Sequence, residues 1–166
     1  MREYLVQYEG FRREDCPPAK RWEFYEDWGL TLQEFLQVAH DGVNAGVIFT
    51  FGEPDAGSSE ALHMIKAAGH SVHIVTDRSF GDPGVAAHAT IAWLNKHDLA
   101  FDTITFSSDK CSANVHLMVD DKLANYHALD NAGVWTWLLD RPWNQSSDNS
   151  IIRVESILDY ALAVVR

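Results

Sequence analysis

From about residue 47 onward, short apolar runs rich in β-branched residues alternate with segments whose apolar residues recur at helical spacing. This alternation is typical of an open α/β sheet in which crossover helices join parallel strands. It constrains the fold more than any single motif does. The runs that we interpret as strands are residues 72–75, 103–106, 116–119 and 134–138, with a weaker one at 151–154.

The segments between these runs carry helix signals. Residues 58–68 place apolar side chains on one face and stop at Gly69, which suits the left-handed position after a helix. A second helix is expected to follow Pro83, because proline is tolerated in a first turn, and a third to span 122–131. Residues 144–150, rich in Asn and Ser, are predicted to form a surface loop.

The first 45 residues differ in composition: they are rich in aromatic and charged residues and contain no strand-like run. We therefore expect a helical, cap-like segment over residues 1–45 and an α/β core over residues 46–166. Two roles are open to the aromatic rings of the first segment, because they could stack on a nucleobase or pack a small helical unit, and we favour packing for each. These rings belong to Trp22, Phe24, Tyr25 and Trp28.

Composition limits the function classes. With 166 residues, of which 46% are hydrophobic, the chain can bury one substantial core. A formal net charge of -11 argues against sequence-independent binding of nucleic acid, so a small polyanion would need a locally positive or metal-neutralised site. The two cysteines have no metal-ligand spacing, and no signal peptide or membrane-length apolar stretch is recognisable. We expect a reduced, cytoplasmic protein without nucleic-acid or membrane partners.

Polar side chains follow three of the predicted strands, at Thr76, Lys110 and the pair Asp120 and Asp121. Because ligands of open parallel sheets gather at the carboxyl ends of the strands, we expect these side chains to face one crevice. The Thr76 hydroxyl and nearby backbone amides can hold phosphoryl oxygens, and Lys110 can supply a positive charge to them. This arrangement predicts binding of a small phosphorylated molecule.

Adjacent carboxylates repel each other unless a cation offsets the repulsion. Mg²⁺ prefers oxygen ligands and also neutralises phosphate, so Asp120 and Asp121 are predicted to bind Mg²⁺, with Asp120 as the direct ligand. Asp77 and Arg78 are further candidates for phosphate binding, although Arg78 could equally pair with Asp77 or Asp82. Each residue taken singly would more often be structural, and it is their order along the chain that favours one phosphate and metal site.

The same segments resemble the haloacid dehalogenase superfamily of phosphohydrolases, in particular its 5'(3')-deoxyribonucleotidase-like members from phages and bacteria. The resemblance rests on residues 69–78, on 101–106 with Asp109 and Lys110, on 119–122 with Asn125, and on 139–144. It implies a Rossmann-like fold with an N-terminal cap and Mg²⁺-dependent hydrolysis of nucleoside monophosphates. Thr76, Lys110 and the pair Asp120 and Asp121 match the second, third and fourth superfamily motifs, which gives Thr76 and Lys110 catalytic roles.

The first motif of that superfamily, a strand ending in Asp-x-Asp-Gly with the aspartate nucleophile, does not occur in this sequence. The partial match at residues 39–42 puts Ala39 at the nucleophile position and reads as helix, so we interpret it as accidental. In the superfamily the first strand is central, between the strands that end at Thr76 and Asp120. Its loss is expected to leave two unpaired strand edges.

Two function classes follow from this departure. The first is a phosphatase whose sequence as given starts beyond the first motif, or whose first strand is supplied elsewhere. The second is a non-catalytic remnant that keeps a phosphate-binding crevice or only the fold. In either case we expect the 166-residue chain alone to hydrolyse phosphomonoesters negligibly, because covalent catalysis cannot pass to a neighbouring residue without rebuilt geometry.

Overall fold

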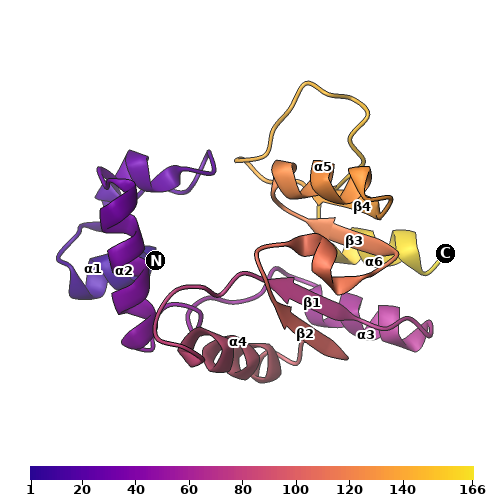
Figure 1. Ribbon diagram of the computed structural model, residues 1–166, viewed down its shortest axis with the longest axis horizontal. Coiled ribbons are helices and arrows are strands. Elements are labelled where there is room, and N and C mark those ends of the chain that lie inside the picture. Colours follow the sequence, from indigo (N-terminus) through magenta and orange to yellow (C-terminus); the bar gives the residue numbers. More distant parts are fainter. The chain divides into compact units, whose positions relative to one another are not determined.

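The computed structural model describes all 166 residues, which form two compact units (Figure 1). The first unit comprises residues 1–53 and 78–96, and the second comprises residues 54–77 and 97–166. The assignment of residues 1–45 as a cap and of 46–166 as a core stays a prediction.

The first unit is helical. Its helices are α1 (Arg2–Tyr8), α2 (Leu32–Asn44) and α4 (Val85–Lys96), with short 3-10 turns η1 (Arg13–Asp15) and η2 (Phe24–Trp28). Helix α2 begins with a capping box, in which the Thr31 hydroxyl accepts from the Glu34 amide and the Glu34 carboxylate accepts from the Thr31 amide. Two apolar clusters hold the unit together, and their buried members are Tyr4, Val43, Val47, Ile48 and Ala86 in one and Leu5, Cys16 and Trp28 in the other.

The aromatic residues of this unit are mostly packing residues. Trp28 is buried, and its indole nitrogen donates to the Pro17 carbonyl oxygen at 2.9 Å. The Phe24 ring lies against the Trp28 ring, with 4.8 Å between centroids, and Tyr25 stacks on Phe35. Trp22, by contrast, is exposed. Packing, the role favoured for each ring, therefore accounts for three of the four, and for Trp22 it stays a prediction.

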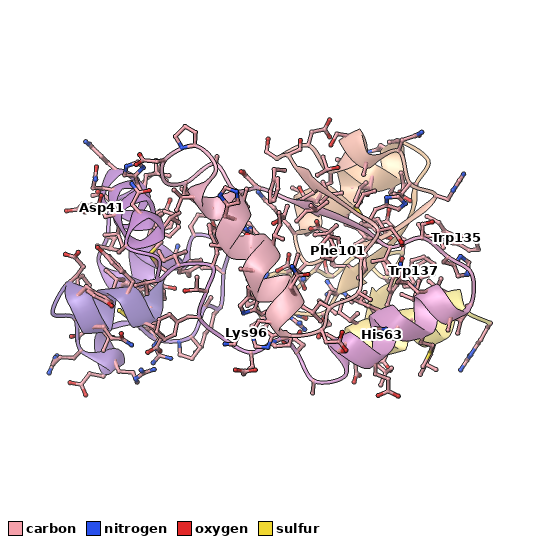
Figure 2. All side chains as sticks on the ribbon, turned by 90° about the horizontal axis from the view of Figure 1, so that it is seen from below. Asp41, His63, Lys96, Phe101, Trp135 and Trp137 are labelled. Atoms are coloured by element: carbon pink, nitrogen blue, oxygen red, sulfur yellow. The ribbon has the colours of Figure 1, made fainter.

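Residues 39–42, the partial match to a phosphatase motif, lie inside helix α2, as their pattern predicted. The Asp41 side chain is exposed on that helix (Figure 2) and accepts hydrogen bonds from Gln37. Gly42 is buried where a Cβ atom would lie 2.6 Å from the Ile48 side chain. A packing contact in the helical unit, and not phosphate chemistry, therefore explains the glycine.

The second unit contains all five strands. Strands β1 (His73–Thr76) and β2 (Thr103–Phe106) form one parallel pair, and β3 (Leu117–Asp120), β4 (Trp135–Leu139) and β5 (Arg153–Val154) form a separate parallel sheet. These strands lie within about two residues of the predicted ones, so the α/β class with parallel strands is confirmed.

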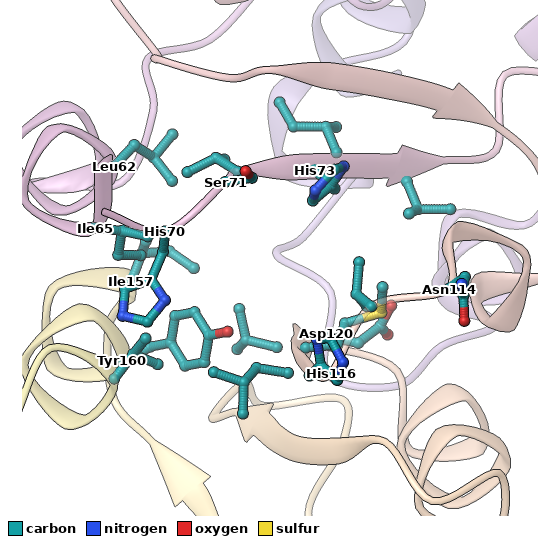
Figure 3. A pocket seen from close by; sticks show the side chains of 18 of the residues that line it. Leu62, Ile65, His70, Ser71, His73, Asn114, His116, Asp120, Ile157 and Tyr160 are labelled. Carbon is teal, nitrogen blue, oxygen red and sulfur yellow. The ribbon is translucent and has the colours of Figure 1, made fainter. Parts of the chain in front are cut away.

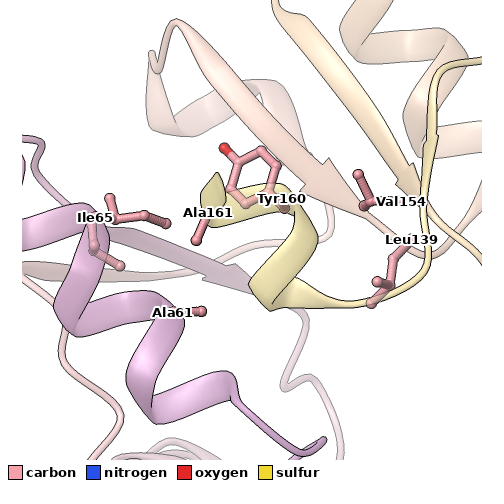
Figure 4. Packing of buried hydrophobic residues seen from close by; sticks show 7 residues of the cluster. Ala61, Ile65, Leu139, Val154, Tyr160 and Ala161 are labelled. Carbon is pink, nitrogen blue, oxygen red and sulfur yellow. The ribbon is translucent and has the colours of Figure 1, made fainter. Parts of the chain in front are cut away.

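Helices cover both faces of this second unit. Helices α3 (Ser58–Ala67) and α6 (Ile157–Val164) pack on each other and share an apolar cluster with strand residues such as Leu139 (Figure 4). Helix α5 (Leu123–Asn131) packs on β3 and β4, where Leu138 is fully buried. Successive residues of β4 thus face opposite helix layers, as the pleat of a strand requires.

Helix α6 had no counterpart in the sequence prediction, whereas α3, α4 and α5 did. The expected surface loop at residues 144–150 is wrong at its first residue, because the Asn144 side chain is buried. The remaining residues of that segment, 145–150, are all exposed, as predicted. Trp135, at the start of β4, is exposed, and its ring stacks on that of Trp137 with 5.8 Å between centroids (Figure 2).

Candidate functional site

Thr76 is the last residue of β1, at the carboxyl end of that strand. Its carbonyl oxygen accepts a hydrogen bond from the Ser107 amide at 3.0 Å, which ties it to the end of β2. The residue is half-buried, and Asp77 follows it directly. The structure therefore places the threonine at a strand end, as the sequence predicts.

Lys110 begins the 3-10 turn η3 (Lys110–Ala113), which follows β2. The turn is fixed at its start by Asp109, whose carboxylate accepts from the Cys111 amide at 2.9 Å. The Lys110 ammonium reaches the end of β1 and donates to the carbonyl oxygen of Val75 at 3.0 Å. The positive charge of Lys110 thus lies beside Val75, the residue before Thr76, although Lys110 follows β2 and Thr76 ends β1.

Asp120 is the last residue of β3; the residue is half-buried, and its carboxylate is hydrogen-bonded. It accepts from the Lys122 amide at 2.7 Å and from the Asn125 side chain at 3.0 and 3.1 Å. Burial raises the pKa of the Asp120 carboxyl above its ordinary value, and these hydrogen bonds lower it in part. The Asp121 charge adds to the increase, and the Lys110 charge opposes it. A bound cation would relieve this cost of ionisation.

Asp121 is positioned through its main chain by Asn144, a residue that the sequence prediction placed in a surface loop. The side-chain nitrogen Nδ2 of Asn144 donates to the main-chain carbonyl oxygens of Asp121 at 2.8 Å and of Leu139 at 2.7 Å. Its side-chain oxygen accepts from the Arg141 amide at 3.1 Å and from Arg153 at 3.0 Å. Asn144 therefore joins the carboxyl ends of β3 and β4 behind the two aspartates. In the sequence, the only sign of this role was that Asn144 belongs to residues 139–144, one of the segments that resemble the superfamily.

A pocket of about 800 Å³ opens between β1 and β3, and Asp120 lies at its edge (Figure 3). Val75 also lines it, and this is the residue whose carbonyl oxygen Lys110 contacts. Asp120 is the only carboxylate among the lining residues. The structure therefore brings the ends of β1 and β3 to one pocket, but it supplies no second carboxylate there.

Arg78 belongs to the first unit, whereas the other candidates belong to the second. Its guanidinium donates to the Thr90 hydroxyl at 2.7 Å and lies 4.0 Å from the centroid of the Phe49 ring. These contacts give the side chain a structural role within its own unit. Phosphate binding by Arg78 and by Asp77 stays a prediction.

The two carboxylates of Asp120 and Asp121 fit Mg²⁺ better than a metal ion whose ligands are all supplied by protein side chains. No group of three or more His, Cys, Asp or Glu side chains that could hold a metal ion comes together in the chain. Mg²⁺ is usually held by one or two carboxylates, with waters and substrate phosphate completing its shell. The partly desolvated carboxylate of Asp120 has this chemistry.

A family model described as 5' nucleotidase, deoxy (pyrimidine), cytosolic type C protein matches residues 6–166. The chain belongs to this family. The resemblance to the deoxyribonucleotidase-like branch of the haloacid dehalogenase superfamily is thereby confirmed, together with its α/β fold. Searches of curated proteins and of solved structures gave no match. None of the helices combines the length and hydropathy needed to cross a membrane.

Proposed function

We propose that this nucleotidase-family chain provides the phosphate- and Mg²⁺-binding part of a phosphomonoesterase for deoxynucleoside monophosphates. The family match over residues 6–166 carries the proposal, and the family's name favours pyrimidine 5'-monophosphates as substrates. The positions of Thr76, Lys110 and Asp120 at the ends of β1, β2 and β3 support it. Both cysteines are free thiols, which fits a reducing compartment such as the cytoplasm.

Each residue has a distinct role in this proposal. The Thr76 hydroxyl and the Lys110 ammonium bind the phosphoryl oxygens, and the ammonium leaves the Val75 carbonyl oxygen to do so. Asp120 and Asp121 hold Mg²⁺, with Asn125 and Asn144 fixing their orientation. Mg²⁺ supplies positive charge that neutralises the phosphate.

We further propose that the 166-residue chain binds its ligand without turning it over. Hydrolysis in this superfamily needs an aspartate nucleophile aligned with phosphorus, and no Asp-x-Asp occurs in the sequence. Asp120, the one carboxylate at the pocket, is committed to hydrogen bonds with Lys122 and Asn125. The chain thus supplies binding groups but no spare carboxylate to attack.

The decisive experiment combines binding and turnover on the purified chain. We expect a pyrimidine deoxynucleoside 5'-monophosphate such as dUMP to bind in calorimetry only with Mg²⁺, while deoxyuridine, the matched ligand without phosphate, does not bind. We expect phosphate release no faster than that of Asp120→Asn. Sustained Mg²⁺-dependent release would contradict the inactivity and require another nucleophile. Absence of binding by both dUMP and inorganic phosphate would reduce the chain to a remnant that keeps only the fold.

A further inference from the structure

Arg153 lies on β5, which is an edge strand of the β3-β4-β5 sheet. The main chain fixes its position beside β4. The carbonyl oxygens of Ile152 and Val154, on either side of Arg153, accept from two amides around the end of β4, each at 2.8 Å. The Arg153 side chain is therefore held near the carboxyl end of β4, where the side chain of Asn144 also binds the main chain.

The Arg153 guanidinium donates to three oxygen atoms, and two of them belong to Asn144. Its Nη1 atom donates to the Asn144 side-chain oxygen at 3.0 Å and to the Asp140 carboxylate at 2.7 Å. Its Nη2 atom donates to the Asn144 main-chain carbonyl oxygen at 2.7 Å. The planar guanidinium thus holds both the side chain and the backbone of Asn144, which requires two donor nitrogens in a fixed geometry.

These contacts help to determine which way the buried Asn144 amide faces. Its nitrogen donates to the carbonyl oxygens of Asp121 and Leu139. Its oxygen accepts from the Arg141 amide and from Arg153. In the reversed orientation the amide nitrogen would face two donors and the amide oxygen two acceptors, with only 2% of the residue exposed to water. Arg153 therefore favours the orientation in which Asn144 donates to Asp121.

The ion pair between Arg153 and Asp140 does not by itself explain an arginine at this position. The two side chains are 24% and 43% exposed, and ion pairs that water reaches contribute little to stability. Gln145 donates to the same carboxylate oxygen of Asp140 at 3.0 Å, so this oxygen keeps a partner without the arginine. The contacts that distinguish Arg153 are therefore the two to the buried Asn144.

We infer that Arg153 is a positioning residue of the Mg²⁺ site, which acts on Asp121 through Asn144. The inference rests on the proposed function, in which Asp120 and Asp121 hold the ion. The 2.8 Å hydrogen bond from Asn144 fixes the Asp121 carbonyl group, and with it the main chain from which the Asp121 carboxylate extends. A guanidinium cannot bind a cation, so Arg153 influences Mg²⁺ through the position of a ligand. Loss of such a supporting residue typically weakens metal binding about 10- to 100-fold.

The sign of the effect on Mg²⁺ affinity separates positioning from charge. Removal of a nearby positive charge by itself favours Mg²⁺ binding, because like charges repel each other. Loss of positioning weakens it instead. We expect Arg153→Met to bind Mg²⁺ at least about tenfold more weakly than the unmodified chain in calorimetry. Arg153→Lys keeps the charge but not the two-nitrogen geometry, so its affinity should lie between the two.

Arg141→Met is the matched control, from the same end of β4. The Arg141 side chain pairs with Asp55 and donates to the Asp140 carbonyl oxygen, whereas its main-chain amide is the group that contacts Asn144. This variant removes the same charge and keeps the contacts of Asn144. Its Mg²⁺ affinity should equal or slightly exceed that of the unmodified chain. A loss as large as that in Arg153→Met would overturn the inference, because any damage to this loop would then have the same effect.

A double variant tests whether Arg153 acts through Asn144. In the Asn144→Ala background the side chain that connects the arginine to Asp121 is absent, so most of the effect of Arg153→Met on Mg²⁺ affinity should disappear. An undiminished loss would show that the arginine acts by another route and would overturn the inference. Urea unfolding of all variants shows that each is folded under the conditions of the titration.

Failure of the inference can be distinguished from failure of the proposed function. If the unmodified chain does not bind Mg²⁺, the proposed function fails and the inference fails with it. If the unmodified chain binds Mg²⁺ and folded Arg153→Met binds it equally well or more tightly, the inference alone is overturned. Arg153 would then contribute only its charge and its ion pair with Asp140.

Discussion

The ammonium of Lys110 donates a hydrogen bond to the main-chain carbonyl oxygen of Val75, 3.0 Å away. A side chain thus satisfies a carbonyl group at the open edge of β1, where a neighbouring strand would ordinarily do so. The same contact holds a positive charge next to Thr76. Binding of a phosphoryl group would break this contact, because the ammonium would turn from the carbonyl oxygen of Val75 to the phosphoryl oxygens.

Replacement Lys110→Met should abolish most phosphate binding. Hydrogen bonds to charged groups contribute about 1.5–3 kcal/mol, so we expect at least a tenfold weaker affinity for dUMP in the presence of Mg²⁺. Calorimetry with dUMP measures the effect. Lys96→Met, at an exposed position at the end of α4, is the matched control. Unchanged affinity of Lys110→Met for dUMP would show that Lys110 does not bind the phosphate.

Replacement Asp120→Asn should stabilise the chain at neutral pH in the absence of Mg²⁺. Because burial raises the pKa of Asp120 in the folded chain, ionisation opposes folding. The contribution of the protonated carboxyl to stability is fully present below the unfolded pKa, ordinarily 3.8, and is lost as the pH rises through the raised value. Urea unfolding at several pH values should show the variant more stable at pH 7, with the difference shrinking toward acid pH.

Mg²⁺ should reverse this difference, because it binds the ionised carboxylate of the unmodified chain and not the amide of Asp120→Asn. The amide oxygen of the variant can still accept from Lys122 and Asn125. Equal stabilisation of both proteins by Mg²⁺ would place the metal elsewhere. If Asp120→Asn were less stable than the unmodified chain at pH 7 without Mg²⁺, ionisation of Asp120 would not oppose folding.

Replacement Asn144→Ala should destabilise the second unit by about 1–3 kcal/mol for each buried carbonyl group left without a partner. The groups concerned are the carbonyl oxygens of Asp121 and Leu139, to which the Asn144 side chain donates. We also expect weaker Mg²⁺ binding, because Asp121 loses its support. Urea unfolding measures the first effect and calorimetry the second. Asn149→Ala, at an exposed position of the same loop, should change neither.

Replacement Gly42→Ala should destabilise the first unit by about 1–3 kcal/mol, as overpacking of a filled core does. The added methyl group would meet the Ile48 side chain at 2.6 Å and Tyr4 at 3.0 Å. Asp41→Ala, on the exposed face of the same helix, should change the free energy of unfolding by less than about 0.5 kcal/mol. Neither change should affect dUMP binding, and a loss of binding in Asp41→Ala would show that the partial motif is functional after all.

The strands and most helices could be predicted from the sequence because their signals are local. β-branched runs marked β1 to β4 to within a residue or so, and Gly69 marked the end of α3. The order of Thr76, Lys110 and the two aspartates also indicated that they follow successive strands. The family resemblance, confirmed over residues 6–166, indicated what those residues are for.

Contacts between distant residues had no such local signal. Asn144 looks like a loop residue until the fold buries it between the ends of β3 and β4, where its amide is the group that can satisfy two carbonyl oxygens. Arg78 lies in a motif-like segment, yet Thr90 and Phe49, which its guanidinium contacts, belong to the helical unit.

Local patterns of a few residues were enough to predict the class of fold and the strand ends that carry the polar residues, and the absence of an Asp-x-Asp can be read directly from the residues. That β1 and β3 border one apolar pocket, and that Lys110 donates to the carbonyl oxygen of Val75, became evident only in the folded chain. Every residue except proline has the same backbone donor and acceptor, so the sequence does not indicate the partner of a given backbone group, which depends on the segments that folding brings beside it.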